Sequence, residues 1–160
     1  MKENIFVTPG YIRALEDKAR VLDARLKEVR AEKNSVYNDD TNAWHDNFAY
    51  ENAVREERLL KSGLQEISGE LNACVVCPND CKTVPESVEI WTSARVRAGQ
   101  GEKTIGVVPL GADDARNNIF NYRAPLVAKI LGAKVGDLIT VKIPSGEFEY
   151  EILEIKRLTD

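Results

Sequence analysis

Three cysteines are the residues of this 160-residue chain whose types and spacing most directly suggest chemistry. Cys74, Cys77 and Cys81 form a C-x2-C-x3-C cluster, and clustered thiols can hold a metal ion or carry out redox exchange. A tetrahedral zinc site needs a fourth ligand, and the only histidine, His45, belongs to a different predicted element. The favoured interpretation is therefore a set of reduced thiols around a linker. A zinc analysis of the purified protein would distinguish this interpretation from a metal site.

Asp39 and Asp40 lie at the break between two long segments with a heptad pattern. The pattern consists of Ile12, Leu15, Ala19, Leu22, Leu26, Val29 and Val36, interrupted only by Lys33, and then Ala53, Leu60, Leu64, Ile67 and Leu71. Two such helices joined by a short polar stretch predict an antiparallel coiled coil. The first helix is expected from about Pro9 to Tyr37, with Thr8 as its N-cap and Pro9 at its first helical position. It is roughly 40 Å long, and a rod of this kind buries one narrow stripe and encloses no pocket. Its functional part is therefore expected at its acidic tip, near residues 38–47.

The polar and aromatic residues of this tip have two interpretations each. From spacing alone, Asp39, Asp40 and Asp46 are expected to be solvated turn and cap residues, a common role of aspartate. Trp44 and Phe48 either pack over the end of the seam, which we favour, or expose a ring to a partner. Alternating charges on a helix usually form a solvated face, and this is expected for the basic residues Arg25, Lys27, Arg30 and Lys33.

Composition divides the chain into two domains. One proline precedes residue 75 and the other five lie from Pro78 onward. We predict a coiled-coil hairpin over residues 1–75, a linker over 76–85 and a compact β-rich domain over 86–160. In that domain alternation predicts strands over 88–96, 104–108, 138–143 and 147–155, and Pro125 opens one short helix that ends near Gly132. The predicted fold class is α+β, with an antiparallel sheet packed on the short helix.

Charge and hydropathy limit the partners. The net charge of −4, with both signs interspersed, argues against free nucleic acid as the main partner, because duplex binding needs a clustered basic surface. No apolar run approaches the roughly 20 residues that span a bilayer, and the N-terminus lacks signal-peptide features, so a cytoplasmic protein without a membrane partner is expected. The two heptad segments can satisfy each other within one chain, which favours a monomer over a self-associating coiled coil.

Two motifs in the predicted β-rich domain resemble signatures of the GreA/GreB family of bacterial transcription elongation factors. The segment A-P-L-V-A-K-I-L-G-A-K-V-G-D, residues 124–137, is similar to the family's S-P-L-x-x-x-L-x-G-x-x-x-G-D. Residues 144–155 are similar to its T-P-x-G-E-x-x-Y-E-I-x-x-I ending, and residues 46–50 resemble its E-N-A-x-Y segment. The likeness covers nearly the whole chain, and it implies that the β-rich domain has an FKBP-like fold.

The resemblance implies an accessory factor without a cofactor of its own, not an enzyme. In the family, the coiled coil enters the secondary channel of bacterial RNA polymerase and the C-terminal domain docks at the channel rim. Tip carboxylates then lie near the 3′ end of backtracked RNA, where they help to hold the second Mg²⁺ of the polymerase and position the attacking water. In-line phosphodiester cleavage uses two metals, and Mg²⁺ prefers oxygen ligands, so a lent carboxylate can stimulate cleavage.

The tip of this chain departs from the family pattern. Aligning the family's G-D-x-x-E-N-A-x-Y with residues 42–50 places Asp46 at the glutamate but Ala43 at the aspartate. The nearest upstream acids are Asp40 and Asp39. The resemblance therefore implies Asp46, then Asp40 and Asp39, as the catalytic carboxylates supplied to the polymerase, with Asp46 and Asp40 on the shared Mg²⁺.

The altered tip leaves a second outcome open. Such a factor could occupy the channel and inhibit or modulate the polymerase without promoting cleavage. A more remote alternative is an FKBP-type prolyl isomerase, which rests on fold likeness alone. Isomerases of this type use an aromatic-lined pocket, and the few aromatics of the β-rich domain mostly fit strand alternation: Phe120, Tyr122, Phe148 and Tyr150.

Overall fold

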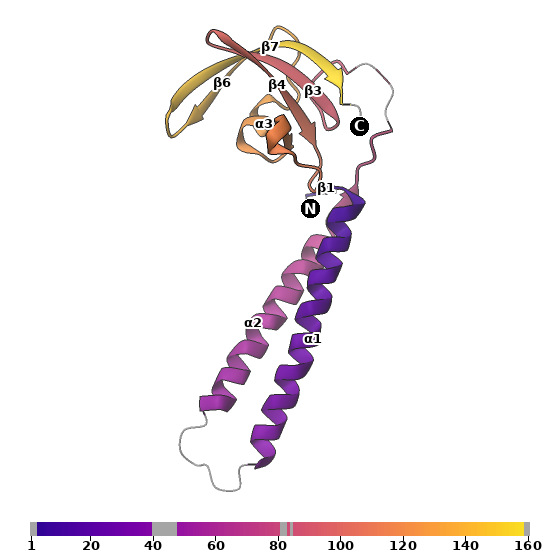
Figure 1. Cartoon of the computed structure of the whole chain (residues 1–160), viewed down its shortest axis with the longest axis vertical. Helices are drawn as coiled ribbons and strands as arrows, with labels where there is room; N and C mark the ends of the chain where they lie inside the picture. Colours follow the sequence, from indigo (N-terminus) through magenta and orange to yellow (C-terminus); the bar gives the residue numbers. More distant parts are fainter. Residues whose placement is uncertain (1–2, 40–47, 81–82, 84, 159–160) are drawn as a thin grey trace. The chain divides into compact units, whose positions relative to one another are not determined.

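The computed structural model describes residues 3–39, 48–80, 83 and 85–158. Its contacts divide the chain into two compact units. One unit holds the N-terminal residues up to Ile5 together with Pro9–Cys74, and the other holds Phe6–Thr8 together with the chain from Val75 onward. The first is helical and the second is built on a curled sheet (Figure 1). The predicted α+β fold class is confirmed.

The helical unit is a hairpin of two antiparallel helices, α1 (Pro9–Asp39) and α2 (Phe48–Leu71). As predicted, α1 begins at Pro9, because the fixed backbone angle of proline suits the first helical turn. Its end differs from the prediction, since the helix continues through Asn38 to Asp39. The cooperativity of a long helix outweighs the low helix propensity of these polar residues. Within the described residues, no helix is long and apolar enough to cross a membrane.

The predicted seam joins α1 to α2, but few of its residues are fully covered. Leu26, Val29, Ala53 and Ile67 are buried, whereas the remaining described seam residues are half-buried: Ile12, Leu15, Ala19, Leu22, Leu60, Leu64 and Leu71. A two-helix rod shares only one face, so most of its apolar side chains keep one side in water.

The second unit contains a five-stranded sheet with the strand order β5-β4-β3-β7-β6. Its elements are β3 (Thr92–Ala98), β4 (Gly101–Val108), the 3-10 helix η1 (Ala115–Asn117), β5 (Ile119–Asn121), α3 (Pro125–Ile130), β6 (Leu138–Ile143) and β7 (Gly146–Arg157). A separate two-stranded sheet pairs β1 (Ile5–Val7) with β2 (Cys74–Val76). The five-stranded sheet curls where the register of β3 against β7 shifts between Arg95 and Val96.

The prediction of a wholly antiparallel sheet is wrong at one edge. β5 pairs parallel to β4, with Gly106 opposite Ile119, because the connection through η1 brings the chain back beside the last residues of β4 before it runs forward again. The first predicted strand also begins later than expected, at Thr92. Trp91 has a φ of +66°, a left-handed conformation in the turn of residues 90–91 that precedes β3.

The core of the second unit lies between the sheet and α3. Val127 and Ile130 of α3 are both fully covered by the sheet residues around them. The sheet contributes Ala94, Val96, Ile105, Val107, Val141, Tyr150, Ile152 and Ile155, and the adjoining loops add Val88 and Ala133. As predicted, α3 starts at Pro125 and stops before Gly132, whose φ of +79° favours glycine.

Candidate functional site

The candidate site is the tip end of the hairpin, where α1 finishes and α2 begins. Asp39 is the last residue of α1. Asp40 and Asp46, together with Trp44 and His45, lie outside the described residues, so their roles stay predictions. Phe48 opens α2 and is 70% exposed. The favoured interpretation of a packed ring is therefore wrong for Phe48, which presents an aromatic surface beside the acidic end of the hairpin.

A buried carboxylate in α2 joins the two helices near this end. The Glu57 residue is only 8% exposed, although charged side chains are rarely buried unless they are paired. Lys33 of α1 places its Nζ 2.5 Å from Oε2 of Glu57. Its other oxygen, Oε1, lies 3.2 Å from Nε of Arg30 and 2.8 Å from Nζ of Lys61. Three cations from both helices thus converge on one carboxylate.

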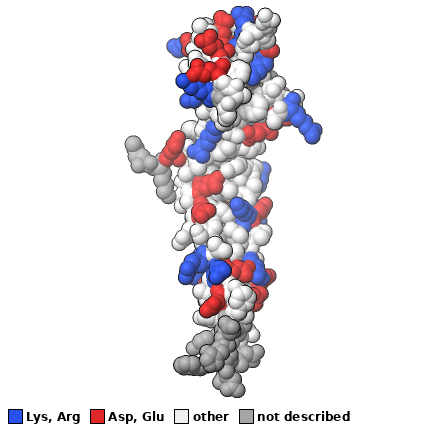
Figure 2. Space-filling view, turned by 90° about the vertical axis from the view of Figure 1, so that its left-hand side faces the viewer, with Lys and Arg blue, Asp and Glu red and all other residues white. Residues whose placement is uncertain are grey.

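A second ionic link lies directly beside the first. Arg25 of α1 donates from Nε to Oε1 of Glu56 at 2.8 Å and from Nη2 to Oε2 at 3.2 Å. This fork geometry makes two parallel hydrogen bonds and fixes the orientation of both groups. Glu28 and Glu32 of α1 also accept from Arg25. Elsewhere on the hairpin, acidic and basic side chains are interspersed on the face that Figure 2 shows.

These contacts shift the pKa of both central groups. Hydrogen bonds from Lys33, Lys61 and Arg30 lower the pKa of Glu57 to about 2, against an opposing effect of its burial. The hydrogen bond to Glu56, followed by that to Glu28, raises the pKa of Arg25 above its ordinary value. Glu57 is therefore ionised at neutral pH, and the tip half of the hairpin is held by fully charged groups.

The basic residues of α1 keep the partly exposed positions predicted for a solvated face, but most of them also form ion pairs across the hairpin. Lys27 does pair only with Asp23 on its own helix at an exposed position. Arg25, Arg30 and Lys33 instead reach acidic residues of α2. A signal for this arrangement was present in the sequence, because Lys33 interrupts one seam and Glu57 occupies a seam step of the other.

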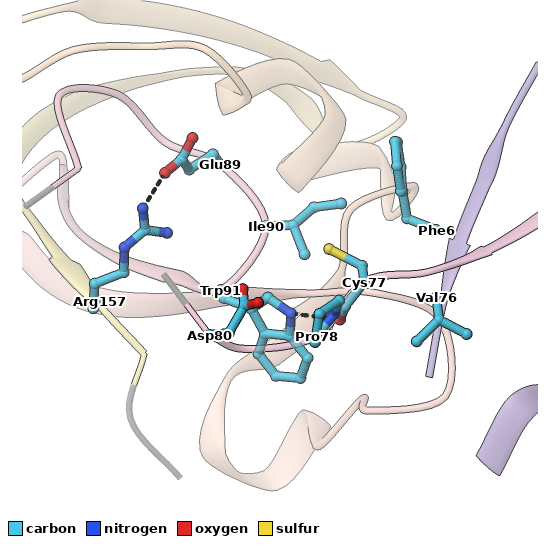
Figure 3. Close-up of a pocket in the computed structure, with 9 residues that line it drawn as sticks. All are labelled: Phe6, Val76, Cys77, Pro78, Asp80, Glu89, Ile90, Trp91 and Arg157. Carbon is cyan, nitrogen blue, oxygen red and sulfur yellow. Dashed lines mark hydrogen bonds and ion pairs between the residues drawn. The ribbon is translucent and has the colours of Figure 1, made fainter. Parts of the chain in front are cut away.

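The second unit has a pocket of about 450 Å³. It is lined by Phe6, Val76, Cys77, Pro78, Asp80, Glu89, Ile90, Trp91 and Arg157 (Figure 3). The indole N–H of Trp91 donates to the backbone oxygen of Cys77 at 2.9 Å, which anchors the residue with the left-handed backbone. Arg157 pairs with Glu89 at 2.6 Å, so the charges at the rim partly neutralise each other.

The structure describes two of the three clustered cysteines. Cys74 and Cys77 are half-buried, and Cys81 lies outside the described residues. Burial raises the pKa of Cys77, while a hydrogen bond from Trp91 opposes the shift. In the part of the chain that the structure describes, no group of three or more histidine, cysteine or acidic side chains could hold a metal ion.

The aromatic residues considered for isomerase chemistry do not line the pocket. Phe120 and Tyr122 pack against the core, and Tyr150 belongs to it. Phe148 is 41% exposed near the end of the β6–β7 hairpin. The aromatic rings that do line the pocket are those of Phe6 and Trp91, so the set weighed from the sequence does not provide an aromatic-lined cavity.

Comparisons with known proteins place these features among relatives. The family model described as "Transcription elongation factor, GreA/GreB, C-term" matches residues 86–157. The transcription elongation factor GreA of Chlorobaculum tepidum is 31% identical over 164 residues, covering 97% of this chain and 98% of the relative. GreA of Chlorobium phaeobacteroides is 28% identical over 163 residues, with coverage of 97% and 98%.

Among solved structures, GreA factor homolog 1 (Gfh1) of Thermus thermophilus matches with a TM-score of 0.44 and 15% identity. The match covers 96% of this chain and 99% of that chain.

Proposed function

The chain belongs to the GreA/GreB family of transcription elongation factors, and on this premise we propose that it acts on RNA polymerase through the tip of its helical hairpin. Factors of this family act on the polymerase and are not enzymes themselves. The proposal is that the hairpin enters the secondary channel of the bacterial enzyme and stimulates cleavage of backtracked transcripts. A cytoplasmic, monomeric protein is consistent with this role and belongs to the same proposal.

The observation that carries the proposal is the length of the hairpin, whose first helix is described as far as Asp39 in the acidic segment. α1 has 31 residues, which corresponds to about 45 Å of helix. A hairpin of this kind encloses no pocket and has only its end to offer to a confined site. Its function is therefore to carry side chains into a site that belongs to another molecule.

The side chains delivered are the tip carboxylates Asp46, Asp40 and Asp39. Carboxylate oxygens fit the preference of Mg²⁺ for hard oxygen ligands, so this donor set suits the Mg²⁺ of the polymerase. When bound there, that ion stabilises charge on the attacking or leaving oxygen of an in-line cleavage. Asp46 and Asp40 would share the ion, and the carboxylates would orient the water near the 3′ end of the backtracked RNA.

A second function is favoured by the altered tip. Ala43 stands where the family motif has aspartate, and the nearest acid for which the structure describes a backbone, Asp39, is still helical. A helical position four residues before Ala43 does not reach the same place without a change in the turn. In this alternative the chain occupies the channel and inhibits or modulates the polymerase without promoting cleavage.

A transcript-cleavage assay on stalled elongation complexes separates the two functions. Wild type is expected to shorten the labelled RNA, whereas Asp46→Ala, or Asp39→Ala with Asp40→Ala, is expected to bind the polymerase without shortening it. The exposed Glu66 of α2 provides a matched control, since Glu66→Ala removes a carboxylate far from the tip. Binding of wild type without any shortening would support the inhibitory function instead.

A further inference from the structure

Each helix of the hairpin carries one charged residue at a position where the seam pattern calls for an apolar one. On α2, Glu57 continues the four-and-three spacing that runs from Ala53 to Leu60. On α1, Lys33 follows Val29 by four residues in the same manner. These two charged seam residues meet across the hairpin at 2.5 Å, so the two interruptions of the pattern are a single feature.

The Glu57 carboxylate is almost completely paired in the observed alignment. Both oxygens have cationic partners, Lys33 on one and Arg30 with Lys61 on the other. Removing such partners from a buried charge costs much more than the intact pair contributes. The pairing therefore does little for overall stability but strongly disfavours any alignment in which Glu57 would face an apolar layer.

The apolar part of the seam does not favour one alignment of the two helices over another. Leu22, Leu26, Leu60 and Leu64 offer similar surfaces to one another, so leucine layers displaced by one helical turn still cover each other. A displacement of one turn, about 5.4 Å, would separate Lys33 from Glu57. It would equally break the fork of Arg25 on Glu56, and the ionic layers thus select the alignment that the leucines leave open.

We propose that Glu57 and Lys33, supported by Arg30 and Lys61, form a register lock that fixes the alignment of α1 against α2 beside the tip. Single polar residues at seam positions specify alignment in other coiled coils at some expense of stability. The functional consequence rests on the proposed function: tip carboxylates are delivered at one depth only when both helices end in register. Glu57 is then a positioning residue for the carboxylates.

The test measures the helix alignment in the free protein. Spin labels at Ser35 of α1 and Asn52 of α2, both exposed, report the distance across the tip half in a background whose three cysteines are serine. Wild type is expected to show one narrow distance distribution. Lys33→Leu with Glu57→Leu is expected to stay helical but to broaden the distribution, or to add a population displaced by about 5 Å, one helical turn.

Two further variants keep the test decisive. Lys18→Leu with Glu66→Leu makes the same exchanges at exposed positions of the same helices and is expected to keep the narrow distribution. Glu57→Gln retains the shape of the side chain and removes only its charge, so it is expected to broaden the distribution less than the apolar pair. A narrow, unshifted distribution for both Glu57 variants would overturn the register lock.

A cleavage assay with the same proteins tests the consequence separately. Lys33→Leu with Glu57→Leu is expected to bind the polymerase as wild type does and to lower the cleavage rate several-fold. The distance measurement contains no polymerase, so the alignment result stands even if wild type proves not to stimulate cleavage. An unchanged cleavage rate in a variant with a broadened distance distribution would overturn the positioning role of Glu57, but not the register lock.

Discussion

The hairpin and the sheet unit are stabilised by different means. The sheet unit encloses a core in which Val96, Ile130 and Ile152 are fully covered. The hairpin has one shared face, its leucines are mostly half-buried, and its tip half is joined by charged residues such as Glu57. Close packing holds the sheet unit in one arrangement, whereas the hairpin owes its length to helix formation and its alignment to ion pairs. This difference between the units suits a protein whose hairpin must carry its tip carboxylates to a defined depth in another molecule.

The largest difference between the two units is expected from truncating apolar side chains. Ile152→Ala should lower the free energy of unfolding of the sheet unit by about 3 kcal/mol, because it leaves a cavity in a closed core. Leu64→Ala in the seam should cost about 1 kcal/mol, because part of that side chain is already in water. Urea unfolding would be followed by Trp91 fluorescence in a Trp44→Phe background and by helical circular dichroism. Equal costs would contradict the contrast between the units.

A smaller effect is expected at the parallel edge of the sheet. A Cβ added at Gly106 would lie 3.0 Å from Cγ1 and 3.5 Å from Cα of Ile119. Gly106→Ala should therefore cost about 1–2 kcal/mol of unfolding free energy through overpacking between β4 and β5. Gly101→Ala on the same strand is the control, since its Cβ would meet only the Ala98 oxygen at 3.9 Å. Similar stability of both variants would show that β5 can move away from β4 at little cost in free energy.

Acid should weaken the hairpin through Glu57. Its folded pKa of about 2 lies below the ordinary value of 4.5, so its contribution is complete above pH 4.5 and is lost as the pH falls towards 2. Thermal melts from pH 6 to pH 2.5 should show a smaller loss of melting temperature for Glu57→Gln than for wild type. Glu154→Gln in the sheet unit is the comparison, because its lowered pKa rests mainly on the exposed Lys156. A larger change for Glu154→Gln would reverse the expected order.

The smallest expected effect distinguishes the two glycines of α2. Gly69 has no atom within 4 Å of an added Cβ, so Gly69→Ala should stabilise the helix by about 0.5 kcal/mol. A Cβ at Gly63 would stand 3.2 Å from Cδ1 of Leu22, and that contact should cancel most of the gain. Thermal melts of the two variants measure the difference. A greater gain in stability for Gly63→Ala than for Gly69→Ala would mean that the two helices move apart at Gly63 without cost.

Regular elements of this chain follow closely from its sequence. The start of α1 at Pro9 and both ends of β6, Leu138–Ile143, were predicted from capping and alternation. The parallel pairing of β5 was not, because alternation reports which side of a strand is buried and not which strand lies beside it. The late start of β3 depends on the left-handed backbone of Trp91, which the sequence pattern of residues 88–96 does not reveal.

The candidate site was predictable in outline only. Periodicity and the family motif indicate a hairpin that carries acidic residues at its end, and α1 does end at Asp39. Asp40 and Asp46 lie outside the described residues, so their roles remain predictions. The ionic layer at Glu57 was missed because a charged residue on a helix looks solvated until its partner on the other helix is known. The charged residues Lys33 and Glu57 at seam positions were its sequence signals.

The central claim is that this chain lends carboxylate oxygens to the Mg²⁺ of RNA polymerase, and its most direct test is a Mg²⁺ titration of transcript cleavage in stalled complexes. Wild type is predicted to lower the Mg²⁺ concentration needed for half-maximal cleavage. Asp46→Asn, at equal occupancy of the polymerase, is predicted to return that concentration towards the value without the factor. An Asp46→Asn variant that shifts the Mg²⁺ requirement as much as wild type does would contradict the account.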